Sequence, residues 1–126
     1  MNPSTEGYLK KYIEKNKIGQ GNFGSATIVT PIKKPNKFYI AKKIKLCNLS
    51  KKDLQNAQME AQLLKDLKHP HIVKYKETFI EDDIFIIIME YCEEGDLAFH
   101  VKRMKKKTEH FSEDLVLNWF LQIAFA

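Results

Sequence analysis

The amino-acid sequence predicts an α+β fold in which strands come first and helices last. Short β-branched or apolar segments fill much of residues 12–46 and 73–91, and one capped helical stretch lies between them. Two amphipathic helical stretches follow Gly95. The chain has 126 residues, of which 44% are hydrophobic and 29% charged, a composition typical of one soluble globular domain. The predicted order is three strands, a helix, two strands and then helices.

The first three predicted strands surround a glycine-rich run and a turn. Residues 12–20 lead into the glycines, and residues 25–30 are short and β-branched, so a strand is expected on each side. Pro31 and residues 33–36 mark a turn, after which residues 38–46 alternate between two faces. The apolar face of this third strand is expected to consist of Phe38, Ile40, Ile44 and Leu46.

The predicted helix begins at Ser50, since an aspartate three residues later is typical of a helix N-cap. It is expected to run to about Lys68, because Pro70 disfavours helical backbone before it. Glu60 falls within the apolar stripe of this helix. That stripe is expected to contain Ala57, Leu63, Leu64 and Leu67.

The rest of the chain is predicted to add two strands and two helices. A strand at 73–79 is followed by a turn at Asp82-Asp83, and the apolar run at 84–91 suits a strand buried on both faces. Helices are expected at about 96–106 and about 112–126. The lysines between Lys102 and Lys107 are interpreted as a solvated helix face rather than a nuclear address.

Charge and cysteine content restrict the classes of function. The net charge of +5 allows nucleic-acid contact, but no base-reading motif is present, so no nucleic-acid partner is expected. Cys47 and Cys92 lack metal-site or redox spacing and are expected to be free, buried thiols in a reducing compartment. The N-terminus has no apolar signal core, and the apolar run at 84–89 is too short to cross a bilayer. A cytoplasmic protein without membrane association is expected, with nuclear or cytoskeletal association left open.

Gly19, Gly21 and Gly24 form a G-x-G-x-x-G run, which is a weak signal by itself. A dinucleotide-binding turn would continue into a helix, and an acidic residue would follow about 20 residues on. Here a β-branched strand follows, and that later stretch carries lysines; no P-loop Gly-Lys-Ser/Thr is present either. The remaining interpretation is a hairpin whose backbone N–H groups approach phosphates, with Phe23 at its tip. The alternative is an ordinary flexible hairpin.

Lys42 and Glu60 are charged residues on apolar faces. Lys42 has the same parity as Ile40 and Ile44, so it is expected to point toward the core. A charge buried alone costs several kcal/mol or shifts its pKa, whereas pairing the two removes both problems. The lysine would then keep donors for phosphate oxygens. The alternative is that each side chain reaches the solvent boundary and the two never meet.

In this order, these features resemble the small lobe of a eukaryotic protein kinase, and most closely the NIMA-related serine/threonine kinases (the NEK family). The resemblance covers residues from about 12 to 126. It implies a five-stranded antiparallel sheet with one helix, followed by the first helices of a truncated large lobe. Residues 1–11 would be an N-terminal extension, 12–92 the ATP-binding lobe with the start of the hinge, and 93–126 an incomplete large lobe. The motifs that carry the resemblance are the glycine run, Tyr39-Ile40-Ala41-Lys42, Glu60, 68–73, 88–97 and 117–123.

The resemblance implies a function and a set of site residues. The family transfers the ATP γ-phosphoryl group to protein serine or threonine, with Mg²⁺. Lys42 would bind the α- and β-phosphates and be held by Glu60, the pair expected to serve catalysis. Met89 would be the gatekeeper beside adenine. The small Ala26 and the large Ile40 would compensate for each other in volume across the pocket. The expected nucleotide-binding residues are Ile18, Gly19, Gly21, Phe23, Gly24, Ala26, Ile40, Lys42, Met89, Glu90, Cys92 and Asp96.

Three of these positions have specific implied roles beside the adenosine. The Glu90 carbonyl and the Cys92 amide would bond adenine, and Asp96 would accept from the ribose hydroxyls. The catalytic aspartate and the Mg²⁺ ligands are absent, because the chain contains no H-R-D and no D-F-G. Binding of ATP without turnover by the isolated chain is therefore expected. The alternative is a catalytically dead module that binds nucleotide or protein, and the apolar residues of 112–126 suggest association with a partner.

Overall fold

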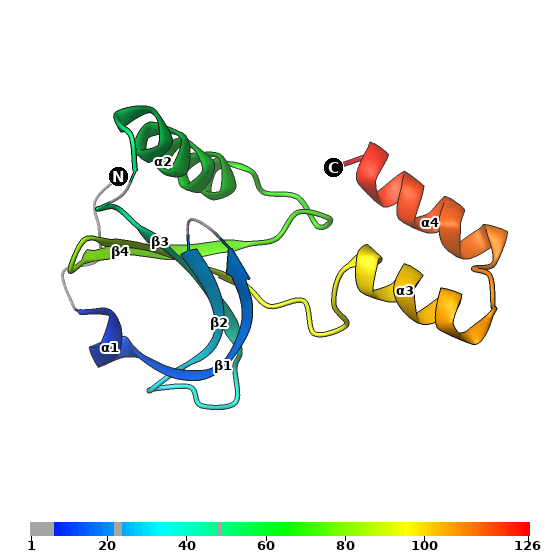
Figure 1. Cartoon of the computed structure of the whole chain (residues 1–126), viewed down its shortest axis with the longest axis horizontal. Helices are drawn as coiled ribbons and strands as arrows, with labels where there is room; N and C mark the ends of the chain where they lie inside the picture. The colour runs from blue at the N-terminus through cyan, green and yellow to red at the C-terminus, as the bar shows by residue number, and fades with distance from the viewer. Residues whose placement is uncertain (1–6, 22–23, 48) are drawn as a thin grey trace. The chain divides into compact units, whose positions relative to one another are not determined.

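The computed structural model describes residues 7–21, 24–47 and 49–126, and Figure 1 shows the chain. Two compact units are present. The first consists of the described residues of Met1–Lys68 together with Val73–Tyr91, and the second of His69–Ile72 with Cys92–Ala126. Phe23 lies outside the described residues.

The first unit is built on a five-stranded sheet in the order β1-β2-β3-β5-β4. All four neighbouring pairs are antiparallel, which confirms the predicted sheet. A short helix, α1, precedes β1, and α2 lies between β3 and β4. The elements are α1 Tyr8–Lys11, β1 Tyr12–Gly21, β2 Gly24–Pro31, β3 Tyr39–Lys45, α2 Lys51–Asp66, β4 Tyr75–Glu81 and β5 Ile84–Glu90.

Both faces of the sheet carry a hydrophobic core. On one face, Phe85 and Ile87 of β5 pack with buried residues of α2. On the other face, Ile86 and Ile88 pack with Phe79 and with two tyrosines from the N-terminal segment. Because successive side chains of a strand point to opposite faces, β5 contributes to both cores, and the prediction of a strand buried on both faces is confirmed.

Helix α2 begins at the predicted N-cap. The Ser50 hydroxyl accepts a hydrogen bond from the backbone N–H of Asp53 at 3.2 Å, which satisfies one of the free donors of the first turn. The expected apolar stripe is wrong in part, because Leu63 and Leu67 are exposed whereas Ala57 and Ala61 are buried. Small side chains four residues apart let the helix approach the sheet closely, and the larger leucines remain outside this contact.

The turn between β4 and β5 is the predicted one, at Asp82-Asp83. Both aspartates have left-handed backbone, with φ of 48° and 58°. A two-residue hairpin turn with positive φ at both central positions matches the twist of the strands that it joins. The Asp83 carbonyl also accepts a hydrogen bond from the Leu46 N–H at 2.7 Å, so the turn holds the end of β3.

Three further side chains expected in the interior lie at the surface. Cys47 and Cys92 are free, as predicted, but both are exposed, because each follows the end of a strand where the chain leaves the sheet. Phe38 is exposed as well, since β3 begins only at Tyr39.

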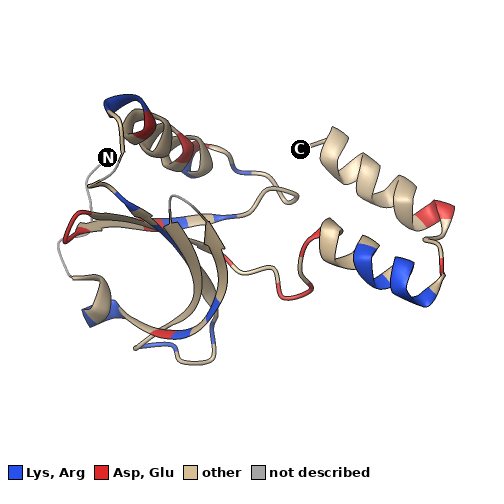
Figure 2. Ribbon diagram, in the orientation of Figure 1, with Lys and Arg blue, Asp and Glu red and all other residues tan. Residues whose placement is uncertain are grey.

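The second unit contains two helices, α3 Leu97–Lys107 and α4 Glu113–Ala124. The helical stretches predicted here are confirmed. The basic residues of α3 are exposed (Figure 2), as a solvated helix face requires. Phe120, Ile123 and Phe125 are also exposed, and their association with a partner stays a prediction. Among the described residues, no helix has both the length and the apolar character that crossing a membrane demands.

Candidate functional site

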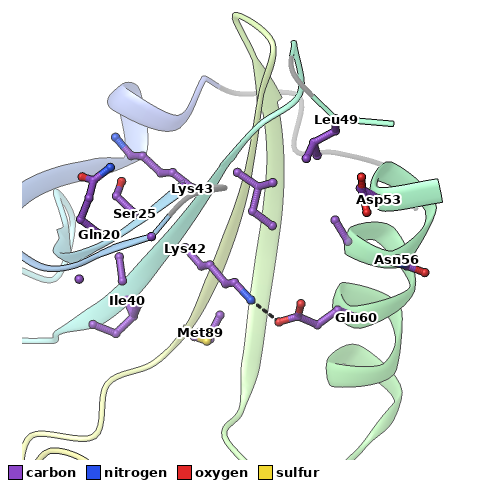
Figure 3. Close-up of a pocket in the computed structure, with 16 residues that line it drawn as sticks. Gln20, Ser25, Ile40, Lys42, Lys43, Leu49, Asp53, Asn56, Glu60 and Met89 are labelled. Atoms are coloured by element: carbon purple, nitrogen blue, oxygen red, sulfur yellow. Dashed lines mark hydrogen bonds and ion pairs between the residues drawn. The ribbon is translucent and has the colours of Figure 1, made fainter. Parts of the chain in front are cut away.

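The first unit contains a cavity of about 620 Å³ that is lined by residues of the β1–β2 hairpin, β3, α2 and β5 (Figure 3). Ligand pockets typically have volumes of about 300–1,000 Å³, so this cavity is large enough for a nucleotide. Its described lining residues are Gly19, Gln20, Gly21, Gly24, Ser25, Ala26, Ile40, Lys42, Lys43, Ile44, Leu49, Asp53, Asn56, Ala57, Glu60 and Met89.

Lys42 from β3 and Glu60 from α2 meet at one side of this cavity (Figure 3). The Lys42 Nζ atom lies 2.5 Å from Glu60 Oε1, so the predicted contact between the two charges is confirmed. The expectation that they are buried is wrong, since the side chains are 40% and 46% exposed. Glu60 stands at the edge of the α2 contact, beside the buried Ala57 and Ala61, and its carboxylate keeps access to solvent.

Each of the three hairpin glycines meets different surroundings. A Cβ atom at Gly24 would lie 1.8 Å from the Lys43 carbonyl oxygen, so the close approach of β3 demands glycine there. At Gly19 a Cβ atom would make ordinary contact with Ala26, at 3.6 Å, and at Gly21 it would meet no atom within 4 Å. Of these three positions, the packing of the sheet therefore requires glycine only at Gly24. The open space in front of Gly21 leaves room for a ligand to approach the backbone.

Apolar residues form another side of the cavity. Ala26, Ile40 and Met89 all line it, from β2, β3 and β5. Ile40 is paired with Met89 in the sheet register, while Ala26 is paired with Lys42. These three side chains give the cavity an apolar wall. The compensation of volume between Ala26 and Ile40 stays a prediction.

Of the expected nucleotide-binding residues that the structure describes, four are not among those that line the cavity. Ile18 is 53% exposed, and Glu90 is bonded to Lys74, whose backbone N–H donates to the Glu90 carboxylate at 3.1 Å. Cys92 and Asp96 belong to the second unit. There the Asp96 carboxylate accepts a hydrogen bond from the Phe99 N–H at 2.7 Å and caps α3. The nucleotide contacts expected of these four residues stay predictions.

Several lining residues were missed by reasoning from the sequence. Asp53 and Asn56 reach the cavity from the first turns of α2. Their spacing to Glu60, at seven and four residues, places all three on one helix face, and this signal was present in the sequence. Leu49, from the segment before α2, and Gln20 and Ser25, from the hairpin, carried no comparable signal.

Lys43, the neighbour of Lys42, connects the cavity to the N-terminal segment. Its ammonium group pairs with the Glu14 carboxylate of β1 and lies over the Tyr8 ring, 5.1 Å from the centroid. Burial alone would raise the pKa of Glu14, but hydrogen bonds from Lys43 and Tyr8 hold that pKa below its usual value. The two adjacent lysines of β3 are therefore held by different acids, on different elements.

Comparison with known proteins agrees with this geometry. The family model described as the protein kinase domain matches residues 12–126. The chain thus belongs to the protein kinase domain family.

Its relatives narrow the class to a NEK-type N-terminal lobe. The chain is 39% identical to the serine/threonine-protein kinase Nek1 of Mus musculus over 94% of its own length, and 42% identical to Nek3 of the same organism over 91%. It is 41% identical to Nek4 of Mus musculus over 86%. The chain spans only 10%, 21% and 14% of the length of these three relatives. These matches favour a partial serine/threonine kinase domain over a catalytically dead binding module.

Proposed function

We propose that this chain is the ATP-binding part of a protein kinase that transfers the γ-phosphoryl group of ATP to serine or threonine side chains of proteins. The observation that carries the proposal is the Lys42–Glu60 ion pair at one side of a nucleotide-sized cavity. Serine or threonine as the acceptor is inferred from the names of the relatives. Mg²⁺ is included on the family likeness, and no residue of this chain is assigned to it.

Lys42 would hold the phosphates of the bound nucleotide. Its ammonium group has three donors, and Glu60 Oε1 accepts from one of them, which leaves two for phosphate oxygens. Glu60 positions the lysine and keeps it from turning to solvent. Because both side chains are partly exposed in this structure, closure of the cavity around a nucleotide would remove water and strengthen their attraction.

The hairpin and the apolar wall would hold the two ends of the nucleotide. Backbone N–H groups at Gly19 and Gly21 would donate to phosphate oxygens, since no side chain blocks their approach. Ala26, Ile40 and Met89 would receive the adenine ring. ATP supplies the transferable phosphoryl group, and these residues bind and orient it. A cytoplasmic location is proposed with this function.

The test is ATP binding by the purified chain. Replacement Lys42→Ala should weaken binding by about tenfold or more, because a charge-assisted hydrogen bond is worth roughly 1.5–3 kcal/mol. Lys45→Ala is the matched control, since Lys45 is an exposed β3 lysine that does not line the cavity, and it should change the Kd by less than about twofold. Equal losses in the two variants would contradict the proposal.

A second pair of variants separates ligand binding from folding. Gly21→Ala should weaken ATP binding while the urea midpoint stays unchanged, because the new methyl group meets only open space. Gly24→Ala should lower the urea midpoint, because its methyl group collides with the Lys43 carbonyl. If Gly21→Ala binds ATP normally, the hairpin does not carry the phosphates.

A further inference from the structure

A second, smaller cavity of about 210 Å³ lies in the first unit, and none of its described lining residues belongs to the first cavity. Three separate segments form it: α1 with the start of β1, the end of β2 with the turn that follows, and β4. Pro31, Ile32 and Tyr12 give it an apolar part. Its volume suits one side chain, and it falls below the usual range for whole small-molecule ligands.

Positive charge dominates the lining of this cavity. Four of its eight described lining residues are lysines, namely Lys10, Lys11, Lys33 and Lys76, and one is a carboxylate, Glu77. Figure 2 shows basic residues in blue on α1 and on the β2–β3 connection, two of the segments that form this recess. Lysines from three segments that converge on one recess create a concentrated positive potential.

The single carboxylate is already engaged. Glu77 Oε2 lies 2.9 Å from the Lys11 ammonium group, and Glu77 Oε1 accepts a hydrogen bond from the Tyr12 hydroxyl at 2.5 Å. Glu77 thus offsets one lysine and offers little to the other three. Lys76 lies over the Tyr39 ring, 4.7 Å from its centroid, a contact that leaves its ammonium donors available to an anion.

We propose that this recess binds the phosphoryl group of a phosphorylated serine or threonine side chain in a protein segment. A phosphoryl group carries a charge of about −1.5 to −2 and three acceptor oxygens, which match the charge and donors of Lys10, Lys33 and Lys76 better than a single carboxylate does. Pro31 and Ile32 offer apolar contact to the carbon stem of such a side chain. A bilayer surface is flat and would not reach into a recess of this size.

The experiment titrates the ¹⁵N-labelled 126-residue chain with the peptide acetyl-Gly-phosphoSer-Gly-amide and records amide chemical shifts. Shifts at Ile32, Lys33 and Lys76, absent with the unphosphorylated peptide, are the expected result. Lys33→Ala and Lys76→Ala should each weaken binding by about fivefold, the size of a partly exposed charge pair, and raised salt should weaken it further. The matched control is Lys34→Ala, which removes the same charge from the same connection outside the recess.

Several outcomes would overturn the assignment. An equal loss in Lys34→Ala and Lys33→Ala would mean that diffuse charge, and not the recess, attracts the peptide. Shifts confined to Lys42 and its neighbours would place the phosphoryl group in the first cavity. If inorganic phosphate binds as tightly as the peptide, the recess recognises phosphate alone and not a phosphorylated serine or threonine side chain. Phosphatidylserine vesicles that bind in a Lys33-dependent manner, while the peptide does not, would identify a membrane surface instead.

Discussion

On one face of the sheet, two tyrosines and a phenylalanine close against each other; on the other, α2 stands beside an open cavity with a pair of opposite charges. Tyr8 and Tyr12 are each 2% exposed and pack around Phe79 at ring-centroid distances of 5.7 and 6.0 Å. Lys42 and Glu60, on the α2 side, are both partly exposed.

This difference indicates that the aromatic cluster serves mainly stability and that the charged side of the sheet is available for ligand binding. Burial of an aromatic ring is worth far more free energy than a half-exposed ion pair, so the aromatic cluster should contribute much more to the stability of this unit than the Lys42–Glu60 pair does. Its polar ends are also satisfied, because the Tyr8 hydroxyl donates to Glu14 and the Tyr12 hydroxyl to Glu77. The α2 face keeps its charges in contact with solvent, where a ligand can reach them.

The largest effect is expected at the centre of the aromatic face. Phe79→Ala should lower the free energy of unfolding by about 3–5 kcal/mol, because it removes a fully buried ring and leaves a cavity. Urea unfolding followed by circular dichroism measures this. Ile80→Ala, at the next and exposed position of β4, is the control and should cost less than about 1 kcal/mol. Similar costs for both variants would show that burial of the Phe79 ring contributes little to stability.

Alkaline pH should also act on the aromatic face. Burial, followed by the hydrogen bonds to Glu14 and Glu77, raises the pKa of Tyr8 and Tyr12 well above the usual value of about 10. The folded state keeps both protons while the unfolded chain loses them, so the stabilisation is complete below pH 10 and declines as the pH rises further. One unit above pH 10 the loss should be about 1–3 kcal/mol.

Urea midpoints measured between pH 8 and pH 11 test this dependence. The double variant Tyr8→Phe, Tyr12→Phe should flatten the decline, because it retains the rings and removes the titrating hydroxyls. A decline of the same steepness in the variant would assign the alkaline effect to other groups.

The anchoring of α2 should have an intermediate effect. Ser50→Ala removes the hydroxyl that caps the first turn and should cost about 1 kcal/mol of stability. Thermal unfolding measures the loss, and Ser50→Asp should restore most of it, because aspartate caps equally well. Because Asp53, Asn56 and Glu60 reach the cavity from this helix, we also expect weaker ATP binding in Ser50→Ala.

The smallest effect on stability is expected at the charge pair itself. Glu60→Gln should change the free energy of unfolding by less than about 1 kcal/mol, since both partners are partly exposed. It should nevertheless weaken ATP binding, because Lys42 loses the group that positions it. A large loss of stability, with ATP binding unchanged, would reverse the comparison between the two faces.

Much of the fold was predictable because its signals are local. The cap at Ser50, the Asp82-Asp83 turn and the apolar run of β5 each depend on a few neighbouring residues, and all three are confirmed. The burial of Tyr8 was not predictable, since its partners Phe79 and Glu81 lie about 70 residues away in the sequence. Tyr8, from the segment expected to be an N-terminal extension, thus contributes to the core.

The site shows the same division between local and non-local signals. Strand parity and helical spacing placed Lys42 and Glu60 on apolar faces and so predicted that the two charges pair. The structure confirms this contact. The exposure of these two side chains depends on how closely α2 approaches the sheet. The buried Ala57 and Ala61 set this approach, and the helical period of apolar residues does not predict it. Likewise, the glycine motif alone does not show that folding requires glycine at position 24. This requirement follows from the position of the Lys43 carbonyl, which leaves no room for a Cβ atom.

The paired aspartates between β4 and β5 have a practical consequence for all of these measurements. Neither Asp82 nor Asp83 is a glycine, yet both adopt a backbone that favours glycine or asparagine. The double substitution Asp82→Asn with Asp83→Gly would release this local cost without touching either cavity, and should raise the melting temperature by a few degrees. Destabilised variants made in this double-substituted protein would then have enough stability to remain folded during the binding assays.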